Sequence, residues 1–394
     1  MTLTTFLLLV LAQDSLILRT PLLIDGSGGR FEDRDVEIRD GSIQEVRPSQ
    51  GTPSYDLVGL TLLPGLIDTH VHVSWHFDGT GRLASDASEE GPEEQVLYAA
   101  ENAYKMLMAG FTTVQSLGAP VDKPLRDAID RGVLPGPRIL TSLRSVTDRT
   151  GDPEAIRAFV RQQAAEGADV IKIFASASIR DGGEPTLTKE QVQAACSEAA
   201  RLGLRSVVHA HGPESARRTV EAGCTTIEHG ALLDEETMSL MAEKGVYFDP
   251  NTHLIFQNYF DNKSRYLGIG NYTEEGFRQM ENAVPSVLEA FKVGLGINRL
   301  KIVFGTDAVA GAHGRNVEEL VYRVESGGQD PHQAILGATS LAAESLGLEE
   351  EIGQIRAGMA ADLIAVEGNP LEDVSALRRV RFVMRSGTIY KFER

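Results

Sequence analysis

Cysteine is scarce in this sequence of 394 residues, which contains only Cys196 and Cys224. A small secreted protein that depends on disulfides carries many more cysteines, so a disulfide framework is excluded. Both cysteines lie among small or apolar residues inside predicted β/α repeats. We therefore expect them to be buried free thiols.

Runs of lysine and arginine are also missing, and the formal net charge is −18. Because nucleic-acid-binding proteins usually carry a basic patch, the sequence predicts no nucleic-acid partner.

No apolar stretch is long enough to span a bilayer, so no membrane span is expected. The short apolar run at 6–12 is similar to the core of a secretory signal, although no basic residue precedes it. Residues 1–12 are therefore a possible signal-like segment. If they act as a signal the protein is periplasmic or secreted, and otherwise it is cytoplasmic.

The middle of the chain alternates apolar strands with amphipathic helices. Strands are expected at 66–72, 112–116, 138–141, 169–175, 205–210, 225–229, 246–249 and 301–306. Eight β/α units within residues 64–349 match the size of a (β/α)8 TIM barrel, which is an α/β fold. An open doubly wound sheet is the main alternative, but the glycine-rich phosphate loop that usually follows its first strand is missing here.

Both ends of the chain, residues 13–63 and 350–394, are rich in predicted strands. Asp40-Gly41 between two alternating segments predicts a type I′ hairpin, and 383–390 predicts a second hairpin. We expect the two ends to build one small β-sandwich subdomain beside the barrel.

Five of the nine histidines fall at the ends of three predicted strands. His70 and His72 are two residues apart, as are His209 and His211, so each pair shares one face of its strand. His229 ends the next strand. Because active sites of such barrels lie at the carboxyl ends of the strands, these imidazoles predict a metal site there.

Lys172 lies within an apolar strand, and Asp307 ends the last strand after Gly305-Thr306. A buried ammonium group is costly unless it is paired. One interpretation is that the Lys172 amine reacts with CO₂ to form a carbamate, an anion that bridges two metal ions. The other is an ion pair between Lys172 and a glutamate of the barrel.

Taken in order, these motifs resemble the amidohydrolase superfamily, in the branch of imidazolonepropionase-like and Xaa-Pro dipeptidase (prolidase)-like metal hydrolases. The segments that carry the resemblance are 63–72, 110–114, 167–174, 209–212, 227–230, 304–307 and 357–364.

The resemblance implies a binuclear site. His70, His72 and Asp307 would bind the more buried ion, His209 and His229 would bind the other, and N6-carboxylated Lys172 would bridge the two. Two zinc ions are expected, with manganese or cobalt as substitutes in a mixed nitrogen and oxygen site. A homo-oligomer is also expected.

The implied activity is hydrolysis of an amide bond in a dipeptide or an N-acyl amino acid. A hydroxide that bridges the metals would attack the carbonyl, with Asp307 as the proton shuttle. Hydrolysis of a cyclic amide, lactone or phosphotriester is an alternative on the same site. A mononuclear deaminase is disfavoured by Lys172, and a non-catalytic scaffold by the six competent ligand positions.

Residues on the loops that follow the strands are candidate contacts to a small-molecule substrate. The predicted contacts are His211, His313, Tyr259 and Arg144, with Arg180, Arg265, Arg315 and His76 as weaker candidates. Arginines are included because they bind carboxylates through two hydrogen bonds. The aromatic segment 253–266, which contains Tyr259, is expected to be a long loop that acts as a lid or a packing surface.

Overall fold

The computed structural model describes residues 15–85, 88 and 90–393. The possible signal-like segment at 1–12 lies outside the described residues.

The strands are β1 (Leu16–Ile24), β2 (Arg30–Arg39), β3 (Ser42–Pro48), β4 (Tyr55–Asp56), β5 (Leu60–Pro64), β6 (Leu66–Val71), β7 (Phe111–Ser116), β8 (Arg138–Thr141), β9 (Ser145–Val146), β10 (Val170–Phe174), β11 (Arg205–Ala210), β12 (Thr226–His229), β13 (Tyr247–Asp249), β14 (Lys301–Ile302), β15 (Leu363–Glu367), β16 (Val380–Arg385) and β17 (Thr388–Phe392).

The α-helices mostly alternate with the strands of the middle segment. They are α1 (Pro92–Met108), α2 (Asp122–Asp130), α3 (Pro153–Glu166), α4 (Lys189–Arg201), α5 (Pro213–Glu221), α6 (Glu235–Lys244), α7 (Leu254–Asp261), α8 (Lys263–Tyr266), α9 (Glu274–Gly296), α10 (Val317–Glu325), α11 (Pro331–Gly337) and α12 (Ser340–Ser345). Short 3₁₀ turns lie at η1 (Asp148–Thr150), η2 (Ile179–Asp181) and η3 (Val374–Arg378).

Local sequence explains where these helices begin and end. The side chain of Asp152 accepts hydrogen bonds from the backbone N–H groups of Glu154 and Ala155, which caps α3. Gly167, with a φ of 95°, ends the same helix in the left-handed conformation. Such a stop returns the chain to the next strand, β10.

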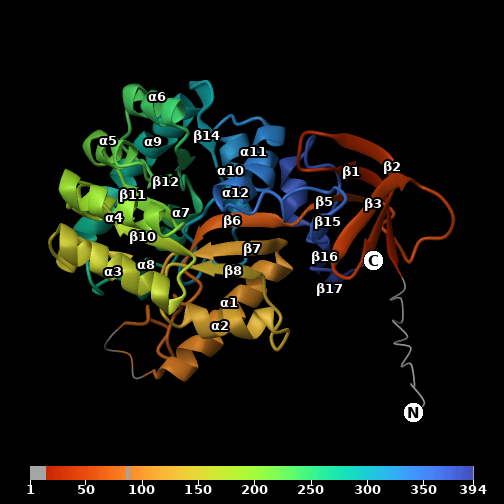
Figure 1. Ribbon diagram of the computed structural model, residues 1–394, viewed down its shortest axis with the longest axis horizontal. Helices are drawn as coiled ribbons and strands as arrows, with labels where there is room; N and C mark the ends of the chain where they lie inside the picture. The colour runs from red at the N-terminus through yellow and green to blue at the C-terminus, as the bar shows by residue number, and fades with distance from the viewer. Residues whose placement is uncertain (1–14, 86–87, 89, 394) are drawn as a thin grey trace, which may run out of the picture.

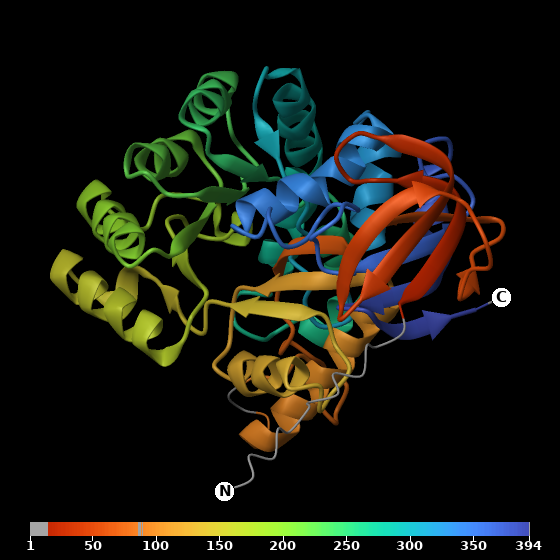
Figure 2. The same cartoon turned by 45° about the vertical axis from the view of Figure 1, so that its right-hand side comes forward.

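The middle of the chain is α/β with parallel strands, as expected. The strand order is β6-β7-β8 in one parallel sheet and β14-β13-β12-β11-β10-β9 in the other. Figures 1 and 2 show helices α3 to α6 on the outside of the strands that they follow. Because helices cover the strands, β6 and β7 are buried along their whole length.

Backbone hydrogen bonds connect the two parallel sheets. The N–H of Asp307 donates to the carbonyl oxygen of His70 at 2.7 Å, and the N–H of His72 donates to that of Ala308 at 2.8 Å. An isolated parallel bridge pairs Val71 with Ala308. The chain after β14 therefore lies directly beside β6.

Both ends of the chain meet in one mixed sheet, on the right of Figure 1. Its order is β17-β16-β15-β5-β1-β2-β3, with β4 paired to β1. The two predicted hairpins are confirmed, and Asp40 and Gly41 have the positive φ angles of 51° and 75° that a type I′ turn requires. Antiparallel pairing of β5 with β15 joins the strands of both ends into one hydrogen-bonded sheet, and apolar residues of β1 to β3 share a core with those of β15 and β16. The expected sandwich stays a prediction.

Strand β15 lies between two cores. Leu363 and Ala365 face the core of the terminal sheet, whereas Ile364 and Val366 pack in the core that includes α1 and α10. This alternation follows from the two-residue period of a strand. It fixes the terminal sheet against the parallel strands.

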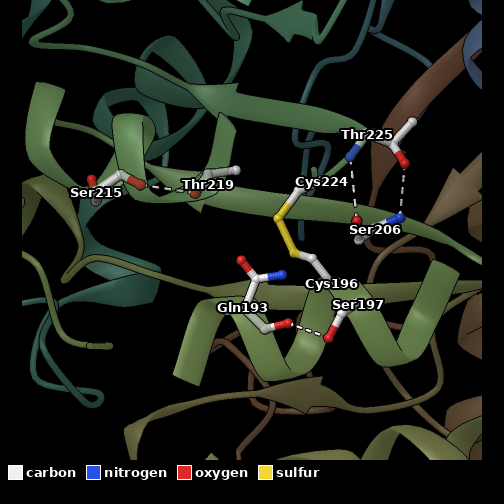
Figure 3. Close-up of a disulfide and its surroundings, with 8 residues drawn as sticks. All are labelled: Gln193, Cys196, Ser197, Ser206, Ser215, Thr219, Cys224 and Thr225. Atoms are coloured by element: carbon white, nitrogen blue, oxygen red, sulfur yellow. Dashed lines mark hydrogen bonds between the residues drawn. A yellow bond between two sulfur atoms is a disulfide. The ribbon is translucent and has the colours of Figure 1, made fainter. Parts of the chain in front are cut away.

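The prediction of free thiols is wrong, because Cys196 in α4 and Cys224 before β12 form a disulfide (Figure 3). Both side chains are buried and their Cα atoms lie 5.2 Å apart. The spacing of 28 residues does not reveal the pairing, because only the packing of α4 beside the following repeat makes the two positions face each other.

No helix in the described part of the chain is both long enough and apolar enough to cross a membrane.

Replacing both cysteines by alanine should lower the free energy of unfolding by about 3 kcal/mol, since the disulfide restricts the unfolded chain. Urea unfolding of the wild-type and variant proteins measures the difference. As a control, thiols are counted with Ellman's reagent in denaturant before and after reduction. Two reactive thiols in the unreduced, air-oxidised protein would contradict the disulfide.

Candidate metal centre and active site

Polar side chains from several strand ends line one cavity of about 150 Å³. The predicted metal ligands among the lining residues are His70, His72, Lys172, His209, His229 and Asp307. The structure thus brings together every residue that the sequence predicts as a ligand. They converge because the carboxyl ends of neighbouring parallel strands open at the same edge.

Two of these residues have strained backbones. His229 and Asp307 have φ angles of 69° and 52°, in the left-handed region that residues other than glycine rarely adopt. The strained conformation occurs where the chain leaves a strand at the cavity. Two residues before Asp307, a Cβ atom on Gly305 would collide with the Asp249 carboxylate and lie 2.9 Å from the Cβ of His70.

Asp307 faces both histidines of the first parallel strand. Its Oδ1 lies 3.3 Å from Nε2 of His70 and 3.0 Å from Nε2 of His72. The potential ligand atoms of these three residues lie within 4.8 Å of one another. Two imidazoles and a carboxylate in this arrangement suit a divalent transition metal.

Glu228 is a buried carboxylate that the sequence analysis does not single out. Its Oε2 contacts Nδ1 of His70 and lies 3.8 Å from Nζ of Lys172. Together with His70 and Asp249 it forms a second group whose potential ligand atoms lie within 4.8 Å of one another. The available signal was an ionisable residue in an apolar strand, the same signal that identifies Lys172.

Lys172 is 1% exposed, and its Nζ donates no hydrogen bond to any described residue. Burial lowers the pKa of this amine to about 8. Its nearest carboxylate is that of Glu228, but 3.8 Å exceeds hydrogen-bond distance. Lys172 therefore has a glutamate neighbour, Glu228, but forms no hydrogen bond with it.

Three histidines form a compact cluster on the other side of the cavity. The ring centre of His209 lies 4.6 Å from those of both His211 and His229. Burial lowers the pKa of all three imidazoles, that of His211 to about 3. They are therefore neutral at physiological pH, which is the form that binds metals.

The structure separates the four predicted substrate contacts. His211 and Tyr259 line the cavity. His313 lies outside the lining, where its Nε2 bonds to a backbone carbonyl oxygen at 3.0 Å. Arg144 is also outside, in an ion pair with Glu166 at 2.5 Å. Of the weaker candidates, the cavity lining includes Arg180 but not Arg265, Arg315 or His76.

The segment 253–266 is helical rather than a long loop, because it forms α7 and α8. Ile255, Phe256 and Tyr259 from α7 line the cavity. All three side chains are buried, so this aromatic run forms part of the cavity wall.

A buried cation supports the wall behind this helix. The Arg323 guanidinium donates hydrogen bonds to Glu319 at 2.9 Å and to Asp249 at 3.2 Å. It also donates to the carbonyl oxygens of Val303 and Gly305. Arg323 thus links β13 and α10 to the segment that leads to the cavity.

Glu319 caps the start of α7. Its carboxylate accepts hydrogen bonds from the backbone N–H groups of residues 252–254 and from the Thr252 hydroxyl. Burial would raise the pKa of Glu319, but Arg323 and these N–H groups outweigh burial and hold it below its ordinary value. The carboxylate therefore stays ionised inside the protein.

Asp68 joins the first parallel strand to the Asp307 segment. It accepts hydrogen bonds from the Thr306 hydroxyl and the Asn316 side-chain amide, each at 2.7 Å. The backbone N–H groups of His70 and Thr306 also donate to it, each at 3.1 Å. Burial raises its pKa to about 7 despite these donors. The contacts fix the position of Asp307 relative to His70.

Comparison with known proteins defines the class to which this fold and site correspond. The amidohydrolase family model matches residues 61–390, so the chain belongs to the amidohydrolase family and is a hydrolytic enzyme that acts on small-molecule substrates.

Individual relatives fall in the predicted branch. The crystal structure of a Xaa-Pro dipeptidase with bound methionine is similar, at 33% identity and a TM-score of 0.86, over 96% of this chain and 100% of that chain. Ochratoxinase of Aspergillus niger is 28% identical over 95% of this chain and 86% of its own length. Imidazolonepropionase of Anaeromyxobacter dehalogenans is 26% identical over 55% of this chain and 58% of its own length.

Replacing Arg323 by methionine should lower the free energy of unfolding by about 3–5 kcal/mol, because Asp249 and Glu319 would be left buried without their cation. Urea denaturation measures the change. The matched control is Arg315→Met, which breaks a half-exposed ion pair with Glu318 and should cost less than about 1 kcal/mol. Equal losses in the two variants would contradict the supporting role of Arg323.

Proposed function

We propose that this amidohydrolase cleaves the amide bond of a dipeptide or an N-acyl amino acid, using two divalent metal ions. One observation carries the proposal. His70, His72, His209, His229, Asp307 and a buried lysine without a hydrogen bond converge on one cavity. The similarity to a Xaa-Pro dipeptidase and to ochratoxinase supports an amide substrate.

We also propose that the two parallel sheets belong to one closed (β/α)8 barrel within residues 64–349, with residues 13–63 and 350–394 as a second domain. The hydrogen bonds between β6 and the segment after β14 support closure on one side. On the other side, the N–H of Asp169 donates to the carbonyl oxygen of Thr141 at 2.8 Å. A homo-oligomer stays a prediction, which light scattering would test.

The side chains that line the cavity can supply ligands for two divalent metal ions. His70, His72 and Asp307 would hold one ion, and His209 and His229 the other. Zinc suits such nitrogen and oxygen ligands. The Glu228 carboxylate at Nδ1 of His70 leaves Nε2 as the coordinating nitrogen, as carboxylates beside metal-binding histidines do.

Carboxylated Lys172 is the proposed bridge. A neutral amine combines with CO₂ to give a carbamate and a proton, and the new anion would occupy a buried position where Nζ makes no hydrogen bond. The alternative ion pair with Glu228 is less favourable, since the two groups are 3.8 Å apart and Glu228 already contacts His70.

When bound, the ions would polarise the substrate carbonyl and lower the pKa of a water molecule, so that this water could lose a proton and act as the nucleophile near neutral pH. Asp307 accepts the proton of the attacking water and delivers it to the leaving nitrogen. The water oxygen bonds to the acyl carbon, the C–N bond breaks, and the products are a carboxylic acid and an amine. The apolar walls of the cavity exclude bulk water from this exchange.

Asp307→Asn should lower kcat at least about 100-fold, because asparagine cannot accept the proton. Amine release from a panel of dipeptides and N-acyl amino acids, with zinc and bicarbonate supplied, measures the effect. The control is Asp261→Asn, which alters a surface carboxylate paired with Arg315. Unchanged kcat in the Asp307 variant, at equal metal content, would contradict the shuttle.

Removal of metal by dialysis against a chelator should abolish activity and lower Tm by roughly 5 °C or more, since ions that bind only the folded state stabilise it. Zinc with bicarbonate should restore both properties in the wild-type protein. Lys172→Arg should recover less metal, because a guanidinium does not form the carbamate. Full metal content and activity in that variant would contradict the bridging role.

A further inference from the structure

Arg180 differs from the other candidate arginines because it lies in the cavity wall. It belongs to η2, immediately after β10, and packs beside the start of α9. Its Cζ lies 4.3 Å from the ring centre of Tyr272 and 5.5 Å from that of Tyr259. Its Nε donates a hydrogen bond to Oδ1 of Asn271 at 3.2 Å. Two rings and an amide therefore hold the guanidinium in place.

No acidic side chain among the described residues lies within ion-pair distance of Arg180. Arg144 and Arg315, by contrast, pair with the surface carboxylates Glu166 and Glu318. A guanidinium that is largely withdrawn from solvent and lacks an anion favours binding of an external one. A carboxylate matches its planar pair of N–H donors.

The remaining charges in the cavity lining indicate what the substrate lacks. Asp307 is the single acidic residue among the described lining residues, and it faces the two histidines of the metal centre. With Lys172 carboxylated as proposed, Arg180 is the cationic side chain in the lining that is left to meet the substrate. A free ammonium group on the substrate would therefore meet this cation and no available carboxylate. An amide or alkyl group would meet no such penalty.

The other walls are mainly apolar. Their residues are Trp75, Phe174, Ile255, Phe256, Met280 and Val309. Such a surface favours apolar acyl groups and side chains by excluding water from them.

We propose that Arg180 determines substrate specificity by binding a free carboxylate, and that the substrate is an N-acyl amino acid rather than a dipeptide with a free amino group. This inference rests on the proposed amide hydrolysis and narrows its substrate class. The carboxylate lies at Arg180, the scissile carbonyl lies at the histidine cluster, and the acyl group lies against the apolar walls. Tyr259, Tyr272 and Asn271 position the guanidinium.

A matched pair of substrates tests the missing ammonium site. N-Propionyl-L-phenylalanine and glycyl-L-phenylalanine have nearly the same shape, but the second carries an ammonium group where the first has a methyl group. The zinc-loaded enzyme should show a kcat/KM at least about 10-fold higher for the propionyl compound. Equal or faster hydrolysis of glycyl-L-phenylalanine would overturn the preference for a blocked amine.

Arg180 variants test the carboxylate site. Arg180→Gln should lower kcat/KM for N-propionyl-L-phenylalanine about 100-fold, because the substrate carboxylate loses a desolvated charge partner. For the carboxamide of the same compound, which has no negative charge, kcat/KM should fall less than about threefold. Arg180→Lys, which keeps the charge, should lie between. Arg144→Gln is the surface control and should match the wild-type enzyme. Equal losses on acid and carboxamide would show that Arg180 is only structural.

A binding measurement separates this inference from the proposed reaction. The ketone 2-benzyl-4-oxohexanoate replaces the scissile nitrogen by carbon, so it binds without being cleaved. Calorimetry should show wild-type protein binding it at least about 10-fold more tightly than its carboxamide, with the difference lost in Arg180→Gln. If this holds while no amide is hydrolysed, the proposed reaction fails and the carboxylate site stands. Equal binding of acid and carboxamide, or binding of neither, would overturn the site.

Discussion

The charge on Arg323 constrains much of the structure. A guanidinium buried in the protein interior is tolerated only if every donor finds an acceptor, and here the acceptors come from β13, α10 and the segment 303–305. Glu319, which it neutralises, in turn holds the start of α7. A single cation outside the cavity lining therefore holds β13, α10 and the segment 303–305 together, and through Glu319 it also holds the start of α7.

Most of the fold could be predicted because its signals are local. Gly167 after a helix and Asp40-Gly41 between alternating segments need no knowledge of distant residues. One error concerns a long-range partner. Cys196 and Cys224 lie in different repeats, and nothing near either residue in the sequence marks the other as its partner. The segment 253–266 was predicted to be a loop because it follows a strand on the active face, and the structure shows it as α7 and α8 with its aromatic side chains in a buried core.

In the candidate site, too, the residues with a clear signal in the sequence could be predicted, and those defined by their distant neighbours could not. Histidines at strand ends could be predicted to converge because the parallel topology dictates where those ends lie. Glu228 and Asp249 were missed because a carboxylate in a strand gains its meaning from what faces it, here Nδ1 of His70 and the Arg323 guanidinium. Arg180 was one of several similar arginines in the sequence, and it is distinguished by its place in the cavity lining together with the absence of an ion pair among the described residues.

The disulfide has a topological consequence. Cys196 and Cys224 close a covalent ring in the chain, and this ring contains the whole of β11 with His209 and His211. A peptide bond broken at the exposed turn between α4 and β11 would leave the two fragments joined by sulfur. The strand that carries two cavity imidazoles is therefore held by covalent bonds from both sides, and a single backbone cut cannot release it.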